Sequence, residues 1–313
     1  MKKLLPILLM LLIFTGCSDT TELGDRAIIQ LAAIDHTDGG FQISALLFSA
    51  GGSGGTIDVK ESNVIKVTGR GSTVSEAISD LSLIDGKEIY MSEAKLLVLG
   101  SGFEQEDIPS VLTMLYRDMR CSLNMPVCCA DSAEMLTDME FTEGITAAEK
   151  PYSMIINGNL SGASPKTTLL DILSDNEGGR ATLIPMFSES ANGSGMTKSK
   201  DGKTAVLSGS RLVAGGRLTY TADMDETAGY MLLSGLSDST SLSITDNTGE
   251  TSCEAYGIEV QWKNDAAKIT AHFRSRSGSP LSEAQEQLAH KRLCNIISAG
   301  IGLYKHSLGS DLS

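Results

Sequence analysis

The sequence predicts an α+β protein with two mixed sheet-and-helix domains, joined by a Gly/Ser-rich linker and preceded by a cleaved lipoprotein signal peptide. Three observations carry this prediction. Short apolar runs rich in strand-forming residues alternate with helical apolar patterns. The polar stretch SESANGSGMTKSKDGK interrupts them and has a linker's composition. An apolar N-terminus stops at a cysteine. The expected parts are a signal peptide (1–16), domains at 17–187 and 204–313, and a linker at 188–203.

The N-terminus has the layout of a secretory signal. Two lysines precede an uncharged apolar run from Leu4 to Phe14, and two small residues follow before Cys17. The run has eleven residues, whereas a membrane-spanning helix needs roughly 20. The ending FTGC resembles a bacterial lipobox, with Phe14 where that pattern prefers Leu. The alternative is an ordinary signal peptide with a chance cysteine. The sequence therefore predicts lipid attachment at Cys17, which becomes the new N-terminus.

Charge restricts how the mature chain can meet a membrane. The net charge of −14 becomes −16 when the two lysines of the signal are removed. Nucleic-acid binding needs basic patches, so nucleic acid is excluded as an expected partner. Electrostatic adhesion to anionic lipid is excluded for the same reason. Acyl chains such as palmitate must supply the attachment, and stable anchoring takes two or more of them.

The other cysteines do not form a complete disulfide framework, because their number is odd. They are Cys121, Cys128, Cys129, Cys253 and Cys294. The adjacent pair in LNMPVCCAD lies in an apolar run, and we expect both residues to be small core side chains. The redox state of the five is left open.

The first half of the chain reads as an opening hairpin followed by alternating strands and helices. Residues 26–34 and 41–48 flank the turn Asp38-Gly39-Gly40. A strand at 64–67 precedes a helix that begins with a capping box formed by Thr73 and Glu76. Further strands are expected at 94–99, 123–130 and 181–184, and helices at 108–116, 132–137 and 166–174.

The second half reads as five strands and two helices. The expected strands are 205–207, 211–214, 239–244, 255–262 and 269–274, with a helix at 224–233 and a long helix from Leu281. Pro280 suits the first helical position. One face of the long helix carries Ala289, Leu293, Ile296, Ile297, Gly300 and Tyr304. Each glycine inside a helix costs about 1 kcal/mol, so Gly300 and Gly302 need a packing reason.

Motifs that would indicate catalysis fail on context. The stretch GGSGG at 51–55 fits G-x-S-x-G, but a second extended segment follows it instead of a helix. Gly202-Lys203-Thr204 lacks the first P-loop glycine, because that position is Thr197. The four histidines show no metal-ligand spacing. The sequence therefore predicts no catalytic residues, no cofactor and no metal site.

The segment GCSDTTELGDRAIIQLAAID resembles the opening of the Ger(x)C family, the lipoprotein C subunit of bacterial spore germinant receptors. Cys17, Asp19, Glu22, Leu23 and Asp35 match the family pattern, and Ser18 replaces its usual Trp. Later family segments are matched in the same order by VTGRGSTVSEAISDLS, IYMSEAKLLVLG and YRDMRCSLNMPVCCA. The third match includes Arg117 and Asp118. In the second, Glu93 stands where the family usually has His. The likeness covers most of residues 17–245. The chain ends soon after the long helix, where family members usually continue, so its C-terminal domain is expected to be shortened.

The resemblance implies a non-enzymatic, lipid-anchored subunit that acts in receptor assembly or signalling during spore germination. Its partners would be two integral-membrane receptor subunits of A- and B-type, and its place the outer face of the spore inner membrane. The alternative is a solute-binding lipoprotein of a membrane transporter, against which the low aromatic content of 5% argues. Adjacent genes would separate the two. The germinant, the interface residues and any small ligand stay open.

Overall fold

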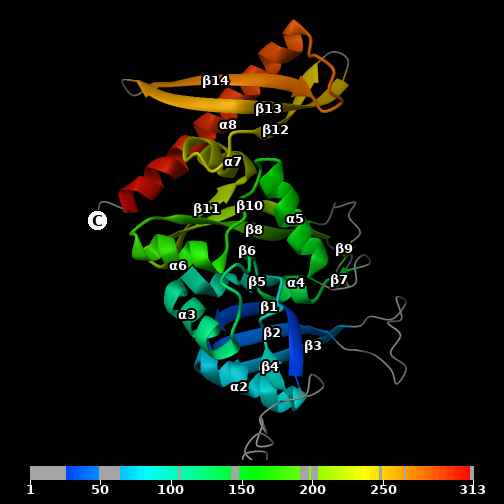
Figure 1. The fold of residues 1–313 in the computed structure, drawn as a ribbon, viewed down its shortest axis with the longest axis vertical. Coiled ribbons are helices and arrows are strands. Elements are labelled where there is room, and N and C mark those ends of the chain that lie inside the picture. Colours follow the sequence, from blue (N-terminus) through cyan, green and yellow to red (C-terminus); the bar gives the residue numbers. More distant parts are fainter. Residues whose placement is uncertain are drawn as a thin grey trace, which may run out of the picture.

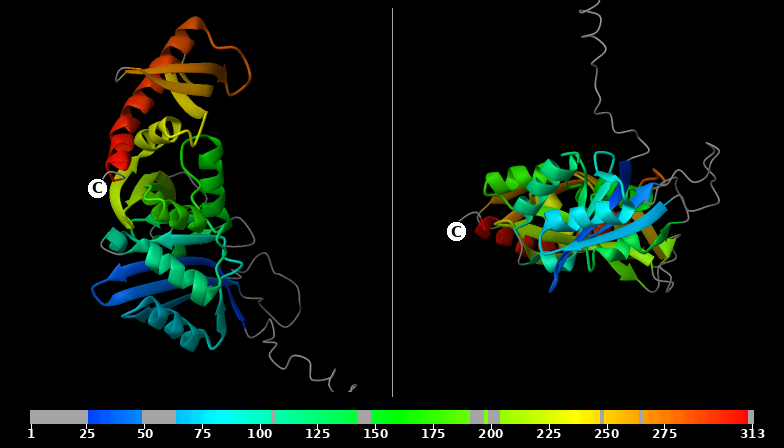
Figure 2. Two further views of the ribbon diagram at one scale, coloured as in Figure 1. Left: turned by 60° about the vertical axis from the view of Figure 1, so that its left-hand side comes forward. Right: turned by 90° about the horizontal axis from the view of Figure 1, so that it is seen from below.

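The computed structural model describes residues 26–48, 64–104, 107–141, 148–190, 197–198, 204–246, 249–263 and 266–310. Within these ranges the chain forms a nine-stranded mixed sheet, a three-stranded antiparallel sheet and a two-stranded pair, with helices packed on the two larger sheets (Figure 1). The molecule is elongated, with the large sheet at one end and the three-stranded sheet at the other (Figure 2). The predicted α+β fold class is confirmed.

The large sheet has the strand order β11-β10-β8-β6-β5-β1-β2-β3, and β4 pairs with β1 outside this path. Four central strands, β1, β5, β6 and β8, are parallel, and antiparallel strands extend the sheet on both sides. The strands are β1 (Arg26–Thr37), β2 (Gly40–Phe48), β3 (Val64–Gly71), β4 (Glu88–Tyr90), β5 (Leu96–Leu99), β6 (Val127–Ala130), β8 (Thr182–Ser190), β10 (Thr204–Ala214) and β11 (Arg217–Asp223). The predicted opening hairpin is confirmed as β1–β2.

Helices cover both faces of this sheet, because successive side chains of its buried strands point to opposite sides. On β1, Ile29 and Ile34 belong to one apolar cluster, and Leu31 and Ala33 belong to another. The first cluster packs under α2 (Val74–Asp85), α3 (Ile108–Met119) and α6 (Leu169–Glu177). The second packs under α4 (Glu134–Thr137) and α5 (Glu149–Leu160).

The predicted capping residues open α2. The backbone N–H of Glu76 donates to the Thr73 hydroxyl at 3.2 Å, and the Glu76 carboxylate accepts from the backbone N–H of Ser72 at 2.9 Å. These bonds satisfy donors that the first helical turn leaves unpaired. The Glu76 carboxylate thus binds the N–H of Ser72, the residue before the N-cap Thr73.

The predicted domain division needs a correction at the level of the sheets. β8 and β10 pair antiparallel from Thr204 opposite Ser190 to Val213 opposite Thr182, so one sheet includes strands from both sides of 188–203. Within that segment, β9 (Thr197–Lys198) pairs with β7 (Glu140–Phe141). A polar Gly-rich stretch suits the connection between two paired strands as well as a linker, and the sequence pattern does not separate the two. Its other residues, 191–196 and 199–203, lie outside the described ranges.

The three-stranded sheet packs against two helices. It contains β12 (Thr240–Asp246), β13 (Gly249–Lys263) and β14 (Ala266–Ser275), and the helices are α7 (Met224–Leu233) and α8 (Glu283–Ser310). One side of each strand is buried against the helices, as Leu242 and Ile244 are on β12. The outer side is polar. This sheet, not the whole of 204–313, is the separate structural unit, because β10 and β11 complete the large sheet.

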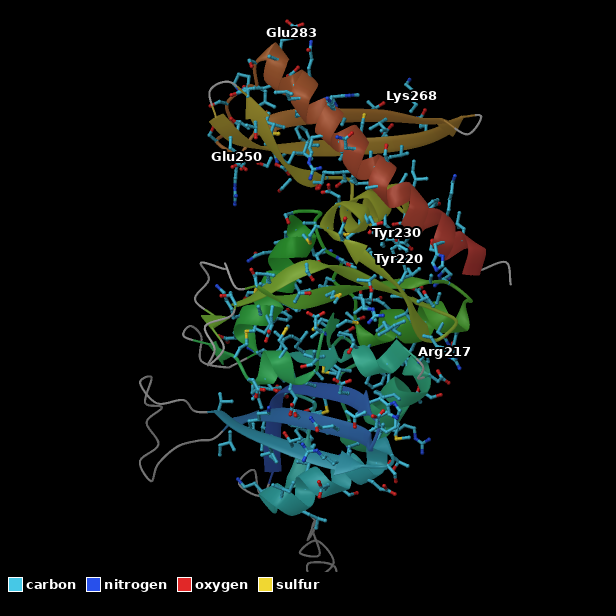
Figure 3. All side chains as sticks on the ribbon, turned by 180° about the vertical axis from the view of Figure 1, so that it is seen from behind. Arg217, Tyr220, Tyr230, Glu250, Lys268 and Glu283 are labelled. Atoms are coloured by element: carbon cyan, nitrogen blue, oxygen red, sulfur yellow. The ribbon has the colours of Figure 1, made fainter. Side chains whose placement is uncertain are left out.

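The long helix α8 spans both parts of the molecule. In Figure 3 Glu283 lies at its outer end, and Tyr220 and Tyr230 lie near its other end. The predicted buried face is confirmed: Ala289, Leu293, Ile296, Ile297 and Gly300 are buried and Tyr304 is half-buried. The helix starts later than the expected Leu281, and Pro280 lies before it instead of in its first position. The Ser282 hydroxyl accepts from the N–H of Gln285 at 3.3 Å and the helix begins at Glu283.

Helices α7 and α8 meet through two glycines. A Cβ on Gly229 would lie 2.8 Å from the Gly300 Cα and overlap the Ile296 carbonyl oxygen, and a Cβ on Gly300 would lie 2.6 Å from the Gly229 Cα. Arg292 holds the same pair of helices by donating to both carboxylate oxygens of Asp225, at 2.6 and 2.7 Å. The packing reason for Gly300 is therefore this close approach. A Cβ on Gly302 would have open space around it, with no atom within 4 Å outside the adjoining helix backbone, so packing gives no reason for this glycine.

We predict that Gly300→Ala lowers the free energy of unfolding by roughly 2–4 kcal/mol, because its methyl group would meet backbone atoms that cannot move independently. Gly302→Ala is the matched control on the same helix. It should raise the free energy of unfolding by up to about 1 kcal/mol, because alanine is the better helix former. Urea unfolding of the two variants checks both values, and equal midpoints would contradict the packing explanation.

Candidate functional site

The predicted attachment residue, Cys17, lies outside the described residues. The described chain begins at Arg26, nine residues further on, where β1 pairs in parallel with β4 through Arg26 and Glu88. Nine extended residues reach at most about 30 Å. The sequence therefore connects Cys17 by a short segment to the end of the large sheet where β1 and β4 both start.

Three large aliphatic side chains are exposed at this end of the sheet: Ile65 (48%), Leu83 (81%) and Ile84 (58%). We call them the anchor-end residues. The last two lie in the final turn of α2, directly before β4. Ile65 lies near the start of β3, which begins at the same end as β1 because β2 is antiparallel to both. The sequence prediction missed this feature, although Leu83 falls outside the apolar stripe of α2 and was a visible signal.

Asp35, one of the residues matched by the family resemblance, lies where the parallel strands end. Its Oδ1 accepts from the backbone N–H groups of His36 at 3.0 Å and Gly102 at 3.2 Å, and its Oδ2 accepts from the N–H of Ala133 at 3.2 Å. Gly102 lies in the turn after β5, and Ala133 lies in the segment after β6. A Cβ on Gly100 would overlap this carboxylate. Asp35 therefore joins the ends of β1, β5 and β6, which is a structural role.

The histidines are not brought together. His36 is on β1, His272 on β14, and His290 and His306 on α8. Each lies beside an aromatic ring: Phe41 at 4.8 Å, Tyr256 at 5.6 Å, Phe273 at 6.3 Å and Tyr220 at 5.6 Å between ring centroids, in that order. In the described part of the chain, no group of three or more His, Cys, Asp or Glu could hold a metal ion.

The described cysteines are free thiols, and all but Cys294 are buried. Burial raises the pKa of Cys121 to about 11. It raises the pKa of Cys129 to about 12, although the nearby Arg211 charge acts in the opposite direction. Burial also raises the pKa of Cys128 well above its ordinary value. Neutral, buried thiols are poor nucleophiles and poor metal ligands. The expectation that Cys128 and Cys129 are core side chains is confirmed.

An open groove of about 630 Å³ runs between α2, α3 and α6. Its lining mixes charges of both signs, including Asp107, Arg117 and Glu177, with apolar atoms of Met114 and Leu173. Neither His nor Cys is among its lining residues, so they supply no imidazole or thiol for acid–base or nucleophilic chemistry.

Among the helices within the described ranges, none combines the length and the apolar character that crossing a bilayer requires.

Together these features define a mixed α+β protein in which Asp35, one of the residues matched by the sequence resemblance, supports the fold. The model of the spore germination protein N-terminal domain family matches residues 19–189, which is more than half of the chain. The chain therefore belongs to this GerAC-like family of spore germination proteins, as the sequence resemblance implies, and is a spore germinant receptor subunit.

Among solved structures, the chain is similar to one described as the crystal structure of the GerBC protein. The sequences are 17% identical, the TM-score is 0.45, and the match covers 85% of this chain and 79% of that one. No curated protein matches the chain.

We predict that Asp35→Asn lowers the free energy of unfolding by about 1–3 kcal/mol, because one carboxylate oxygen becomes an amide donor facing a backbone N–H. Asp38→Asn, in the exposed turn of the same hairpin, should change it by less than about 0.5 kcal/mol. Thermal unfolding of both variants measures the difference. A variant at position 35 as stable as the one at position 38 would exclude the structural role.

Raised thiol pKa values also predict a pH dependence. From an ordinary 9.0, burial raises the pKa to about 11 for Cys121 and about 12 for Cys129 in the folded chain. Above about pH 9 the unfolded chain loses these protons while the folded chain keeps them, so stability falls by up to about 1.4 kcal/mol per pH unit for each thiol. Below about pH 9 the thiols are protonated in both the folded and the unfolded chain, so their full contribution to the free energy of unfolding is retained. Cys129→Ala should make the decline between about pH 9 and 11 shallower in urea unfolding; an unchanged slope would contradict the assignment.

Proposed function

We propose that this chain is a lipid-anchored, non-enzymatic subunit of the germinant receptor, attached through acylated Cys17 to the outer face of the spore inner membrane. The observation that carries the proposal is the position of the family match. It begins at residue 19, two residues after the cysteine of the lipobox-like sequence. The mature chain would start at Cys17, with residues 1–16 removed.

The anchor would act by concentrating the chain beside its partners. A short tether raises the effective concentration of an attached domain to roughly mM, so individually weak contacts suffice for assembly. The partners we propose are the two integral-membrane receptor subunits of A- and B-type. The chain would support receptor assembly or signalling during germination through its protein surfaces.

Three features support a non-enzymatic role. The side chain of Asp35 is engaged by backbone donors, the buried thiols are protonated at neutral pH, and each histidine lies beside an aromatic ring. A general base needs a reacting group within hydrogen-bond reach, and a nucleophile needs an activating neighbour. Asp35 and the buried thiols serve the fold instead. The partly exposed Cys294 thiol lies 3.6 Å from His290 Nδ1 on α8, and neither residue lines the groove between α2, α3 and α6.

The anchor is tested by Cys17→Ala in sporulating cells. We expect the amount of the chain in the spore membrane fraction to fall about tenfold or more, because the acyl chains supply the attachment. Germination should be impaired. Cys294→Ala keeps the anchor and should behave as the unmodified chain does. Intact mass spectrometry should find acyl groups on a chain that starts at Cys17; an unchanged distribution between membrane and soluble fractions, or an unacylated terminus, would reject the proposal.

A further inference from the structure

We propose that the end of the large sheet that carries the anchor-end residues, Ile65, Leu83 and Ile84, docks on the lipid surface itself. Their side chains would enter the boundary between headgroups and acyl chains. This inference rests on the proposed anchor at Cys17 and adds a second, non-covalent contact between the chain and the bilayer.

The geometry of the strands places these residues beside the tether. β1 starts at Arg26 and pairs with β4 at Glu88, and the last turn of α2 ends at Asp85, three residues before that pair. In Figure 1 α2 and β4 lie together at the lower end of the molecule. A tether of nine residues that reaches at most about 30 Å keeps this end near the bilayer.

The distribution of apolar side chains on α2 favours a lipid contact. Earlier in the helix, Val74, Ala77 and Leu81 are buried against the sheet, and the exposed positions Ser75 and Glu76 are polar. In the last turn this arrangement ends, because Leu83 is 81% exposed and Ile84 is 58% exposed. Adjacent aliphatic residues at an exposed helix end fit the interfacial region, where burial of apolar area drives binding.

The charge of the chain also favours an apolar contact with lipid over an electrostatic one. A mature net charge of −16 prevents electrostatic adhesion of the whole chain to anionic lipid. The exposed charged residues that adjoin the anchor-end residues in the described chain are Lys66, Lys87 and Glu88, so these side chains do not form a block of negative charge. Apolar insertion beside the acyl anchor is the contact that this surface can make.

Docking at this end would fix how the receptor subunit stands on the membrane. The three-stranded sheet lies at the opposite end of the elongated molecule (Figure 2). Its labelled residues Glu250 and Lys268 would therefore lie in the part of the molecule that is remote from the bilayer (Figure 3). The polar outer side of β12–β14 would be presented to partners or to solvent at a distance from the lipid.

The test uses the full acylated chain, reconstituted in phosphatidylcholine vesicles whose acyl chains carry bromine, a quencher of tryptophan fluorescence. Trp262→Phe removes the single native tryptophan. Leu83→Trp then introduces a probe in the anchor-end residues, and Ile84→Trp is a second probe should the first fail to fold. Leu236→Trp, at an exposed leucine between α7 and β12, outside the anchor end, is the matched control. We expect the probe at 83 to lose about half of its emission or more in brominated vesicles, and the control to lose almost none.

Flotation of the same vesicles separates the two proposals. A chain that floats with the vesicles while the probes at 83 and 84 are unquenched has its anchor but no lipid docking, which overturns the inference alone. A chain that fails to float overturns the anchor and the docking together. Crosslinking of position 83 to an integral-membrane subunit in spores, without quenching in lipid vesicles, would assign this surface to a protein partner and also overturn the inference.

Discussion

The close approach of Gly229 and Gly300 is the contact on which the relation between the two sheets depends. Because neither residue carries a Cβ, the backbones of α7 and α8 come together, and the ion pair between Arg292 and Asp225 fixes their register. One half of α8 then covers β12–β14, and Leu303 in the other half reaches the cluster formed by Leu183 and Leu212 of the large sheet. A single helix thus belongs to two cores, and the two parts of the molecule share it.

The sequence predicted a helix or strand well where interactions between residues close together in the chain determine it. The opening hairpin, the cap of α2 and the whole of α7 follow from turn residues, side-chain caps and apolar periodicity. The helix α5 was missed, because EKPYSMIINGNL contains a proline, a glycine and a weak apolar stripe. The pairing of β8 with β10 was missed for a different reason. Strand partners are decided by contacts between distant parts of the chain, and a Gly-rich connection looks the same whether it joins strands or domains.

For the candidate site, too, the sequence shows short local motifs but not the contacts between distant parts of the chain. Acylation of Cys17 stays a prediction, which rests on a short linear motif outside the described residues. Asp35 was singled out by resemblance, but its partners Gly102 and Ala133 are distant in the chain, and they define its role as a junction. The position of Leu83 outside the apolar stripe of α2 indicates an exposed side chain, but periodicity does not show whether another element covers it, and the structure shows that no described element does.

The strand order has a consequence for how this protein can be divided. A fragment that ends at residue 189, the limit of the family match, would contain β8 without β10 and β11. The N–H and C=O groups of β8 that pair with β10 would then form an open sheet edge, next to Phe187 and other core side chains. Such an edge can recruit a strand from another copy, so recombinant pieces cut at this point are prone to self-association, whereas pieces extending through Asp223 retain every strand of the large sheet.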